Sequence, residues 1–456
     1  MRALLFLVAL FFAVPGMAEP ARVTVTRQGD SFVADFTLPT DAPAWGFWRS
    51  STAASDNLSW RAKSWRVLTP GVALQRRGQQ DALVGANGRP VPRHVRVRLT
   101  PYTGDLNANY VPALRLGGDS VALFDGHFAV FSADLATLDK LSPGFDPQQA
   151  NVGDYGTAVL FKGKALRIAG DTARYRKGES AGAYALFGVP RAIVANGVAT
   201  VIDSELPQWI ADDLATFTPR VMGAMAARLG PPGISQPTVL AAWEGPGREG
   251  ASMNGGTLKG LILMRFEGSA ALRPLPALRN MARWFIAHEA SHFWLGQAVD
   301  YGSTRDSWIM EGGADLLAVR TVSGLDPAFN RTKVLNEALA GCSRLAVKPV
   351  ATSLERGEER ANYACGAVFS LVAEKASKGD FYGFVRGLID SNRADHIVNS
   401  AEWLAALDAR AGNGEASSRI RRLLETGSSR PAEELAGLLK SAGIAFTLDS
   451  RGVPQL

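Results

Sequence analysis

The sequence predicts an α+β protein with more than one domain, and three observations support this fold class. The chain has 456 residues, and a single domain is usually shorter than this. Residues from about 20 to 200 alternate between apolar and polar side chains and are interrupted by turn residues, which is typical of β-strands. From Pro207 onward, helical patterns dominate. We therefore expect a β-rich N-terminal domain followed by a region that becomes mostly helical.

The N-terminus has the features of a secretion signal. Arg2 precedes an unbroken apolar run from Leu4 to Val14, and the small residues up to Ala18 resemble a signal-peptidase site. The run is too short to span a bilayer permanently, and the alternative is an uncleaved N-terminal anchor. We predict a signal peptide over residues 1–18 and an exported mature chain that begins near Glu19. The composition, rich in Gly, Ala and Arg, favours a bacterial periplasm, and no later apolar run predicts a membrane span.

The β-rich domain is predicted over residues 19–204. Three segments alternate as half-buried strands do: Val23–Thr26, Ser31–Phe36 and Val95–Leu99. Four tryptophans in this part have two interpretations, a platform for carbohydrate or peptide, or the commoner role of core aromatics. They are Trp45, Trp48, Trp60 and Trp65.

The second half begins with a predicted helix over Trp209–Leu229, which Gly230 and two prolines end. Strands are predicted at Thr238–Trp243 and Leu258–Phe266, with a glycine-rich stretch between them. Helices continue to about Leu439, and residues 444–448 are expected to form a closing strand. We place a second domain at 205–325 and a helical C-terminal region at 326–456.

Composition and charge restrict the class of protein. Hydrophobic residues make up 46% and charged residues 20%, as in ordinary globular proteins. The formal net charge of +6 is spread thinly, without a run of five basic residues, so we expect no nucleic-acid partner. The two cysteines, Cys342 and Cys365, can form a disulfide between neighbouring helical segments in an exported protein, and neither belongs to a Cys-x-x-Cys metal motif.

A His-Glu-x-x-His motif comprises His288, Glu289 and His292. Histidines four residues apart lie on one face of a helix, so both imidazoles can bind one ion. Glu289 follows the first of them and can reach a water at the metal without binding the ion. Zinc lowers the pKa of such a water toward ~7, and a carboxylate can accept its proton as the water attacks a carbonyl. We predict two zinc ligands and a general base; the alternative is a pair of histidines held by hydrogen bonds.

Glu311 stands beyond His292 with eighteen residues between them, on a second predicted helix that begins at Asp306 or Ser307. Its carboxylate would complete a site of two histidines and one glutamate with an open fourth position, the arrangement of catalytic zinc. Asp315 follows one turn later on the same face. We expect Asp315 to accept a hydrogen bond from a ligand imidazole, that of His288, and we expect one Zn²⁺ per chain.

This motif and its spacing to Glu311 resemble the membrane alanyl aminopeptidase family of gluzincins, which includes leukotriene A4 hydrolase. Trp308–Gly312 is similar to that family's W-L-N-E-G segment, and Phe293–Gly296 to its Q-W-F-G. Tyr363–Phe369 is similar to its Y-E-K-G-A segment. The resemblance implies a thermolysin-like zinc catalytic domain over 205–325 and a role for Tyr363 in holding the tetrahedral oxyanion, for which a phenol is a suitable donor.

The chain departs from the family at the segment that binds the substrate's free amine. The family carries G-x-M-E-N on an edge strand, whereas this chain reads G-A-S-M-N-G-G over residues 250–256 and lacks the glutamate. The resemblance implies substrate-binding roles for Gly250, Ala251 and Asn254. Glu244 or Glu249 are alternatives for the missing carboxylate, although neither stands at the matching position.

Together these features predict a secreted zinc metallopeptidase that acts on peptide substrates, more specifically an aminopeptidase. The alternatives are an endopeptidase, another amide or epoxide hydrolase of the same fold, and a catalytically degenerate peptide-binding module.

Overall fold

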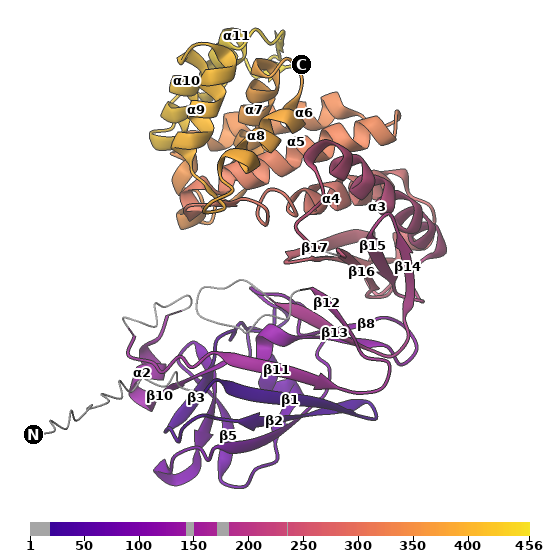
Figure 1. The fold of residues 1–456 in the computed structure, drawn as a ribbon, viewed down its shortest axis with the longest axis vertical. Coiled ribbons are helices and arrows are strands. Elements are labelled where there is room, and N and C mark those ends of the chain that lie inside the picture. The colour runs from indigo at the N-terminus through magenta and orange to yellow at the C-terminus, as the bar shows by residue number, and fades with distance from the viewer. Residues whose placement is uncertain (1–18, 143–149, 171–181, 235) are drawn as a thin grey trace, which may run out of the picture. The chain divides into compact units, whose positions relative to one another are not determined.

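The computed structural model describes residues 19–142, 150–170, 182–234 and 236–456, and the chain divides into two compact units (Figure 1). The first unit consists mainly of residues up to 188, and the second mainly of residues from 189 onward. The predicted signal peptide lies outside the described residues. Within the described ranges, no helix is both long enough and apolar enough to cross a membrane.

The part up to residue 188 is built from β-strands, as predicted. Its strands are β1 (Ala21–Gln28), β2 (Ser31–Thr37), β3 (Ala44–Phe47), β4 (Trp65–Val67), β5 (Val72–Arg77), β6 (Gln80–Gly85), β7 (His94–Leu99), β8 (Ala113–Arg115), β9 (Val121–Phe124), β10 (Val130–Ala133), β11 (Thr157–Lys162), β12 (Arg167–Gly170) and β13 (Ala183–Phe187). They form sheets in the orders β11-β1-β2-β7-β4, β10-β3-β6-β5 and β12-β13-β9-β8. Two short helices accompany them, α1 (Trp60–Ser64) and α2 (Leu135–Lys140).

The tryptophans of this part belong mainly to its core. Trp45 and Trp60 are almost fully buried and Trp65 is 7% exposed, so the core interpretation is correct for these three side chains. Trp48 is partly buried and packs against Phe131, with ring centroids 4.7 Å apart. A surface platform would require exposed rings, which these residues do not provide.

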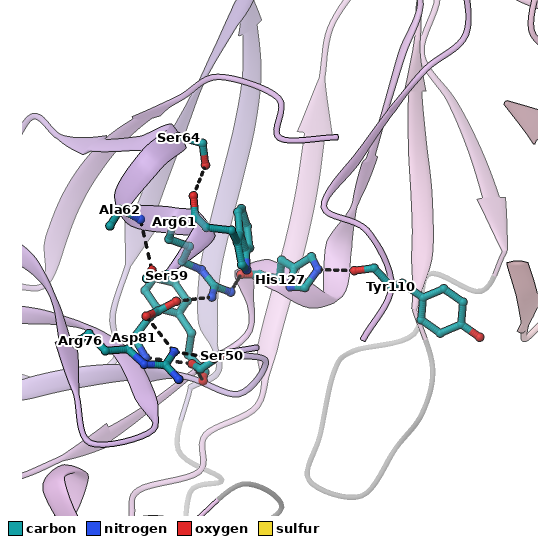
Figure 2. A network of polar contacts seen from close by, with 11 residues as sticks. Ser50, Ser59, Arg61, Ala62, Ser64, Arg76, Asp81, Tyr110 and His127 are labelled. Atoms are coloured by element: carbon teal, nitrogen blue, oxygen red, sulfur yellow. Dashed lines mark hydrogen bonds and ion pairs between the residues drawn. The ribbon is translucent and has the colours of Figure 1, made fainter. Parts of the chain in front are cut away.

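A buried polar network crosses the core of the first unit (Figure 2). The fully buried Arg61 donates to Asp81 at 3.1 Å and to the main-chain oxygen of His127 at 2.8 Å, and its guanidinium lies 4.5 Å from the ring centroid of Trp60. The Nε2 atom of His127 lies 2.8 Å from the carbonyl oxygen of Tyr110. A charge is tolerated inside a protein when it is paired in this way. Burial lowers the pKa of Arg61 to about 10, and burial together with the nearby Arg61 charge lowers the pKa of His127 well below its ordinary value.

The second unit contains one mixed sheet of β14 (Arg191–Ala195), β15 (Val198–Ile202), β16 (Thr238–Trp243), β17 (Ser252–Leu258) and β18 (Leu261–Glu267). The strand order is β14-β15-β16-β18-β17, with β15, β16 and β18 parallel and β17 antiparallel to β18. Our predicted boundary at 204 is therefore wrong, because β14 and β15 pair into this sheet and the second unit resumes at Val189. The glycine-rich stretch is not only a loop: its second half is β17, an edge strand.

Helices form most of the rest of the second unit, and the first two of them lie beside this sheet (Figure 1). They are α3 (Gln208–Leu229), α4 (Pro276–Ser291), α5 (Ser307–Leu325), α6 (Arg331–Leu345), α7 (Arg360–Ala376), α8 (Phe381–Ser391), α9 (Ser400–Ala411), α10 (Glu415–Glu425) and α11 (Pro431–Ser441). Short strands pair as β19 (Asp300–Tyr301) with β20 (Ile397–Val398) and β21 (Thr447–Leu448) with β22 (Pro454–Gln455). The helix α3 ends at Leu229, directly before Gly230, whose φ of 89° suits glycine, as predicted.

The helices from α3 to α11 share one hydrophobic core. The predicted division at residue 325 consequently does not separate two compact units, although the region after it is helical as expected. An apolar pattern can mark a helix but does not say which helices share a core.

Candidate metal centre

The His-Glu-x-x-His motif occupies the C-terminal end of α4. Leu278, Ala282 and Ile286 recur every fourth residue and are buried in the core of the second unit. This packing fixes the rotation of α4, and with it the direction of His288 and His292, which are also four residues apart. The last helical residue is Ser291, and His292 is the C-cap residue with helical φ and ψ angles.

Glu311 on α5 faces both histidines. Its Oε2 atom lies 3.4 Å from Nε2 of His288 and 3.6 Å from Nε2 of His292, and the two Nε2 atoms are 3.2 Å apart. The structure therefore brings the three predicted ligands together, as a group that can hold a metal ion.

The other ring nitrogens show which tautomers these histidines adopt. Nδ1 of His292 lies 2.9 Å from the carbonyl oxygen of Leu295, which can only accept a hydrogen bond, so this nitrogen carries the proton. Nδ1 of His288 lies 2.8 Å from Asp315, the partner that the sequence predicts. In a neutral imidazole that donates through Nδ1, Nε2 is an acceptor. Both Nε2 lone pairs therefore point toward the place that the Glu311 carboxylate also faces.

When both imidazoles are neutral, as metal binding requires, three acceptors thus converge without a donor between them. The Oε2 atom of Glu311 is buried and has no hydrogen-bond partner among the described residues, which is costly unless a cation supplies the missing interaction. Ligands arranged tetrahedrally at ~2.0–2.1 Å around one ion lie about 3.3 Å from one another, close to the 3.2–3.6 Å found here. Two imidazoles and one carboxylate are also the donor set of catalytic zinc. These residues fit a zinc ion.

The charges around this place favour a cation as well. Burial acts to lower the pKa of His288, but Asp315 and Glu311 outweigh it and hold the pKa well above its ordinary value. Burial acts to lower the pKa of His292 as well, but the Glu311 carboxylate outweighs it and raises this pKa above its ordinary value. Burial acts to raise the pKa of Glu311, yet the facing imidazoles hold it well below its usual range. All three directions express one preference, for positive charge between the ligands.

Tyr363 reaches the same place because α5 and α7 touch along their backbones. A Cβ atom on Gly312 would lie 2.0 Å from the carbonyl carbon of Gly366, so neither glycine tolerates a side chain without movement. Residue 312 follows Glu311 directly, and Tyr363 stands one turn before Gly366. The Tyr363 ring stacks on His288 with centroids 5.7 Å apart. Burial, then the Glu311 carboxylate, raises the pKa of the Tyr363 phenol, which therefore keeps its proton.

Thr257 on β17 is a site residue that the sequence did not reveal. Its hydroxyl donates to Oε2 of Glu289 at 2.7 Å and lies 3.0 Å from the main-chain oxygen of the same residue. This contact fixes the direction of the Glu289 carboxylate. The only signal in the sequence is the position of Thr257 in a strand after the glycine pair, which does not identify its partner.

The residues predicted to bind substrate are gathered less closely than the three candidate metal ligands. Gly250 and Ala251 precede β17, and the carbonyl oxygen of Gly250 accepts a hydrogen bond from Ala270 at 2.8 Å. Asn254 lies on β17 and is exposed. The residue of β17 that contacts Glu289 is instead Thr257, three residues after Asn254. The alternative Glu244 forms an ion pair with the buried Arg265, and Glu249 is exposed in the segment before β17.

Comparisons with known proteins agree with this fold. No family model matches the chain, and no curated protein matches its sequence. Among solved structures, an aminopeptidase N family protein from Idiomarina loihiensis matches with a TM-score of 0.58 and 10% identity, over 91% of this chain and 78% of that chain. The chain has the fold of that protein. The resemblance inferred from the zinc motif is thereby confirmed at the level of the fold.

Two further matches also cover 91% of this chain. The yeast LTA4 hydrolase has 12% identity, a TM-score of 0.49 and 68% of its own chain covered. A zinc metallopeptidase from Deinococcus radiodurans has 14% identity, a TM-score of 0.48 and 95% of its chain covered.

Proposed function

We propose that the protein is an exported zinc metallopeptidase that hydrolyses peptide bonds. The observation that carries this proposal is the convergence of three acceptors from His288, His292 and Glu311 on one place, with the Glu289 carboxylate beside it. The sheet of β14 to β18 together with α4 and α5 would then be a thermolysin-like catalytic unit.

When bound, the zinc ion would polarise the substrate carbonyl and lower the pKa of a water. Glu289 accepts the proton of the attacking water and delivers it to the leaving amine. Thr257 holds the Glu289 carboxylate in place through its 2.7 Å hydrogen bond. Tyr363, kept protonated by its raised pKa, donates a hydrogen bond to the oxygen on which negative charge develops. Asp315 holds His288 in the tautomer that presents Nε2.

The edge strand β17 is suited to an extended peptide. It is hydrogen-bonded to β18 on one side, and it is the last strand in the order of its sheet. An extended substrate can add to such an edge through main-chain hydrogen bonds, which gives Asn254 and its neighbours on β17 a binding role. Gly250 and Ala251 would act at the start of this strand.

Cleavage next to a free N-terminus is the first activity to test, and an endopeptidase is the second candidate. The ion pair of Glu244 with the buried Arg265 favours the second, because a carboxylate already neutralised is a poor partner for a substrate amine. Paired peptides with free and acetylated N-termini separate the two. Cleavage of the free peptide alone supports an aminopeptidase, equal cleavage of both supports an endopeptidase, and cleavage that persists in Glu289→Gln contradicts the mechanism.

Export is supported by the disulfide. Cys342 on α6 and Cys365 on α7 are joined, and such bonds persist in oxidising compartments such as the periplasm. N-terminal sequencing of the protein from a bacterial periplasmic fraction tests this part. A chain that starts near Glu19 is the expected result, whereas an intact Met1 in a cytoplasmic fraction would contradict it.

A further inference from the structure

A groove of about 490 Å³ lies between α6 and α7 and opens beside the candidate metal centre. Trp284, Asp315 and Tyr363 are among the residues that line it. Each of them neighbours His288: Asp315 through a hydrogen bond of 2.8 Å, and the rings of Trp284 and Tyr363 at centroid distances of 5.3 and 5.7 Å. We name it the α6–α7 groove. A group bound there lies next to the place where the peptide bond would be cleaved.

The walls of the α6–α7 groove are apolar and made mostly of small or aliphatic side chains. Val319 on α5 and Leu335 on α6 line it, together with the small side chains of Ala338, Ala364 and Ala367. Besides Asp315, which is hydrogen-bonded to His288, the charged residues that line the groove are exposed and of both signs. They are Glu337, Arg344, Glu359 and Arg360. Since these charges balance, the groove selects for apolar surface and size rather than for charge.

The width of the groove is fixed by covalent and steric contacts between its walls. The disulfide of Cys342 and Cys365 joins α6 to α7, and both cysteines are fully buried. One residue earlier on each helix, a Cβ atom on Gly341 would lie 3.0 Å from the Cβ atom of Ala364. The helices therefore approach as closely as their residues permit at this level and can neither separate nor close further. The groove exists before a ligand enters, which lowers the cost of binding.

We propose that the α6–α7 groove binds a large apolar side chain, aromatic or branched aliphatic, of a residue adjacent to the cleaved bond. This rests on the proposed peptidase function and names its substrate class. The volume falls within the range of ligand pockets, about 300–1,000 Å³. Removing one such side chain from water favours binding roughly ten- to hundredfold over alanine.

The test uses peptides in which the residues on the two sides of the cleaved bond are varied, one at a time, between Ala and Phe. Ala338→Phe fills the groove. Ala340→Phe is the matched control, since the same substitution on the same helix lies in surface depressions outside the groove. Wild type and Ala340→Phe should prefer Phe over Ala at one of the two positions by roughly ten- to hundredfold in kcat/KM. In Ala338→Phe this preference should disappear while the Ala peptide is still cleaved.

A wild type without preference for Phe at either position, or an unchanged preference in Ala338→Phe, would overturn the proposal while leaving the peptidase function intact. If Ala338→Phe does not fold, as a thermal melt will show, Val334→Phe fills the groove from a half-buried lining position instead. If wild type cleaves no peptide, the peptidase function fails and calorimetry decides the groove separately. The groove proposal is supported if Glu289→Gln binds the Phe peptide more tightly than the Ala peptide and loses this difference when Ala338→Phe is added. Equal binding of both peptides by Glu289→Gln refutes the proposal.

Discussion

Replacing Gly312 with alanine tests whether the contact of α5 with α7 sets the position of Tyr363. The added Cβ atom would lie 2.0 Å from the carbonyl carbon of Gly366, whereas ordinary contact begins at 3.4 Å, so the two helices must separate by about 1.4 Å. Glu311 is held by its neighbours on α4, and we therefore expect α7 to move and to carry Tyr363 away. A displacement of ~1 Å in a catalytic group can lower the rate ~100-fold.

The assay compares kcat, zinc content and thermal stability for Gly312→Ala and Gly324→Ala. We expect about a hundredfold loss of kcat in the first variant, with zinc still bound because the ligands lie on α4 and α5, and a loss of about 1–3 kcal/mol in stability from overpacking. Gly324 lies on the same helix with no atom within 4 Å of an added Cβ, so its variant should keep kcat and gain about 0.5–1 kcal/mol. A Gly312→Ala variant with wild-type kcat and stability would refute the reasoning.

Four further predictions concern single contacts. Asp315→Asn should weaken zinc binding about 10–100-fold, measured by chelator competition, because Nδ1 of His288 loses its charged acceptor; unchanged affinity would contradict this. Thr257→Val should lower kcat roughly tenfold or more at constant KM, since a hydrogen bond to a charged group is worth about 1.5–3 kcal/mol, and an unchanged kcat would remove Thr257 from the site. Replacing Cys342 and Cys365 together with alanine should cost about 3 kcal/mol in denaturant unfolding, from the loop that the disulfide closes. The lowered pKa of His127 means that the unfolded chain binds a proton below pH 6.5 which the folded chain does not; thermal melts should therefore show stability falling as the pH drops below that value, less steeply in His127→Gln, and parallel profiles would argue against it.

The cluster of three candidate zinc ligands was predictable because its pattern is local. A spacing of four residues places His288 and His292 on one helix face wherever the helix packs, and Glu311 follows in the next helix. The role of Asp315 as a partner of His288 follows from the same regularity, one turn further along α5.

Contacts between segments distant in sequence were not predictable. The pairing of β15 with β16 moved the domain boundary, since a strand pattern does not indicate which sheet a strand joins. Thr257 meets Glu289 only through the register of β17 beside α4. The expected helix start at Asp306 is correct in position, but its carboxylate bonds Ser400 at the start of α9 instead of capping its own helix. Such tertiary partners compete with local capping and win when they are buried.

The most direct test of the zinc-peptidase account is the zinc content of the purified protein, measured together with peptide hydrolysis before and after chelation. The account predicts about one zinc per chain, loss of hydrolysis on chelation, its return when zinc is added, and no stable zinc in Glu311→Gln. A protein that binds no zinc in the wild-type form, or that hydrolyses peptides equally well after the metal is removed, would contradict it.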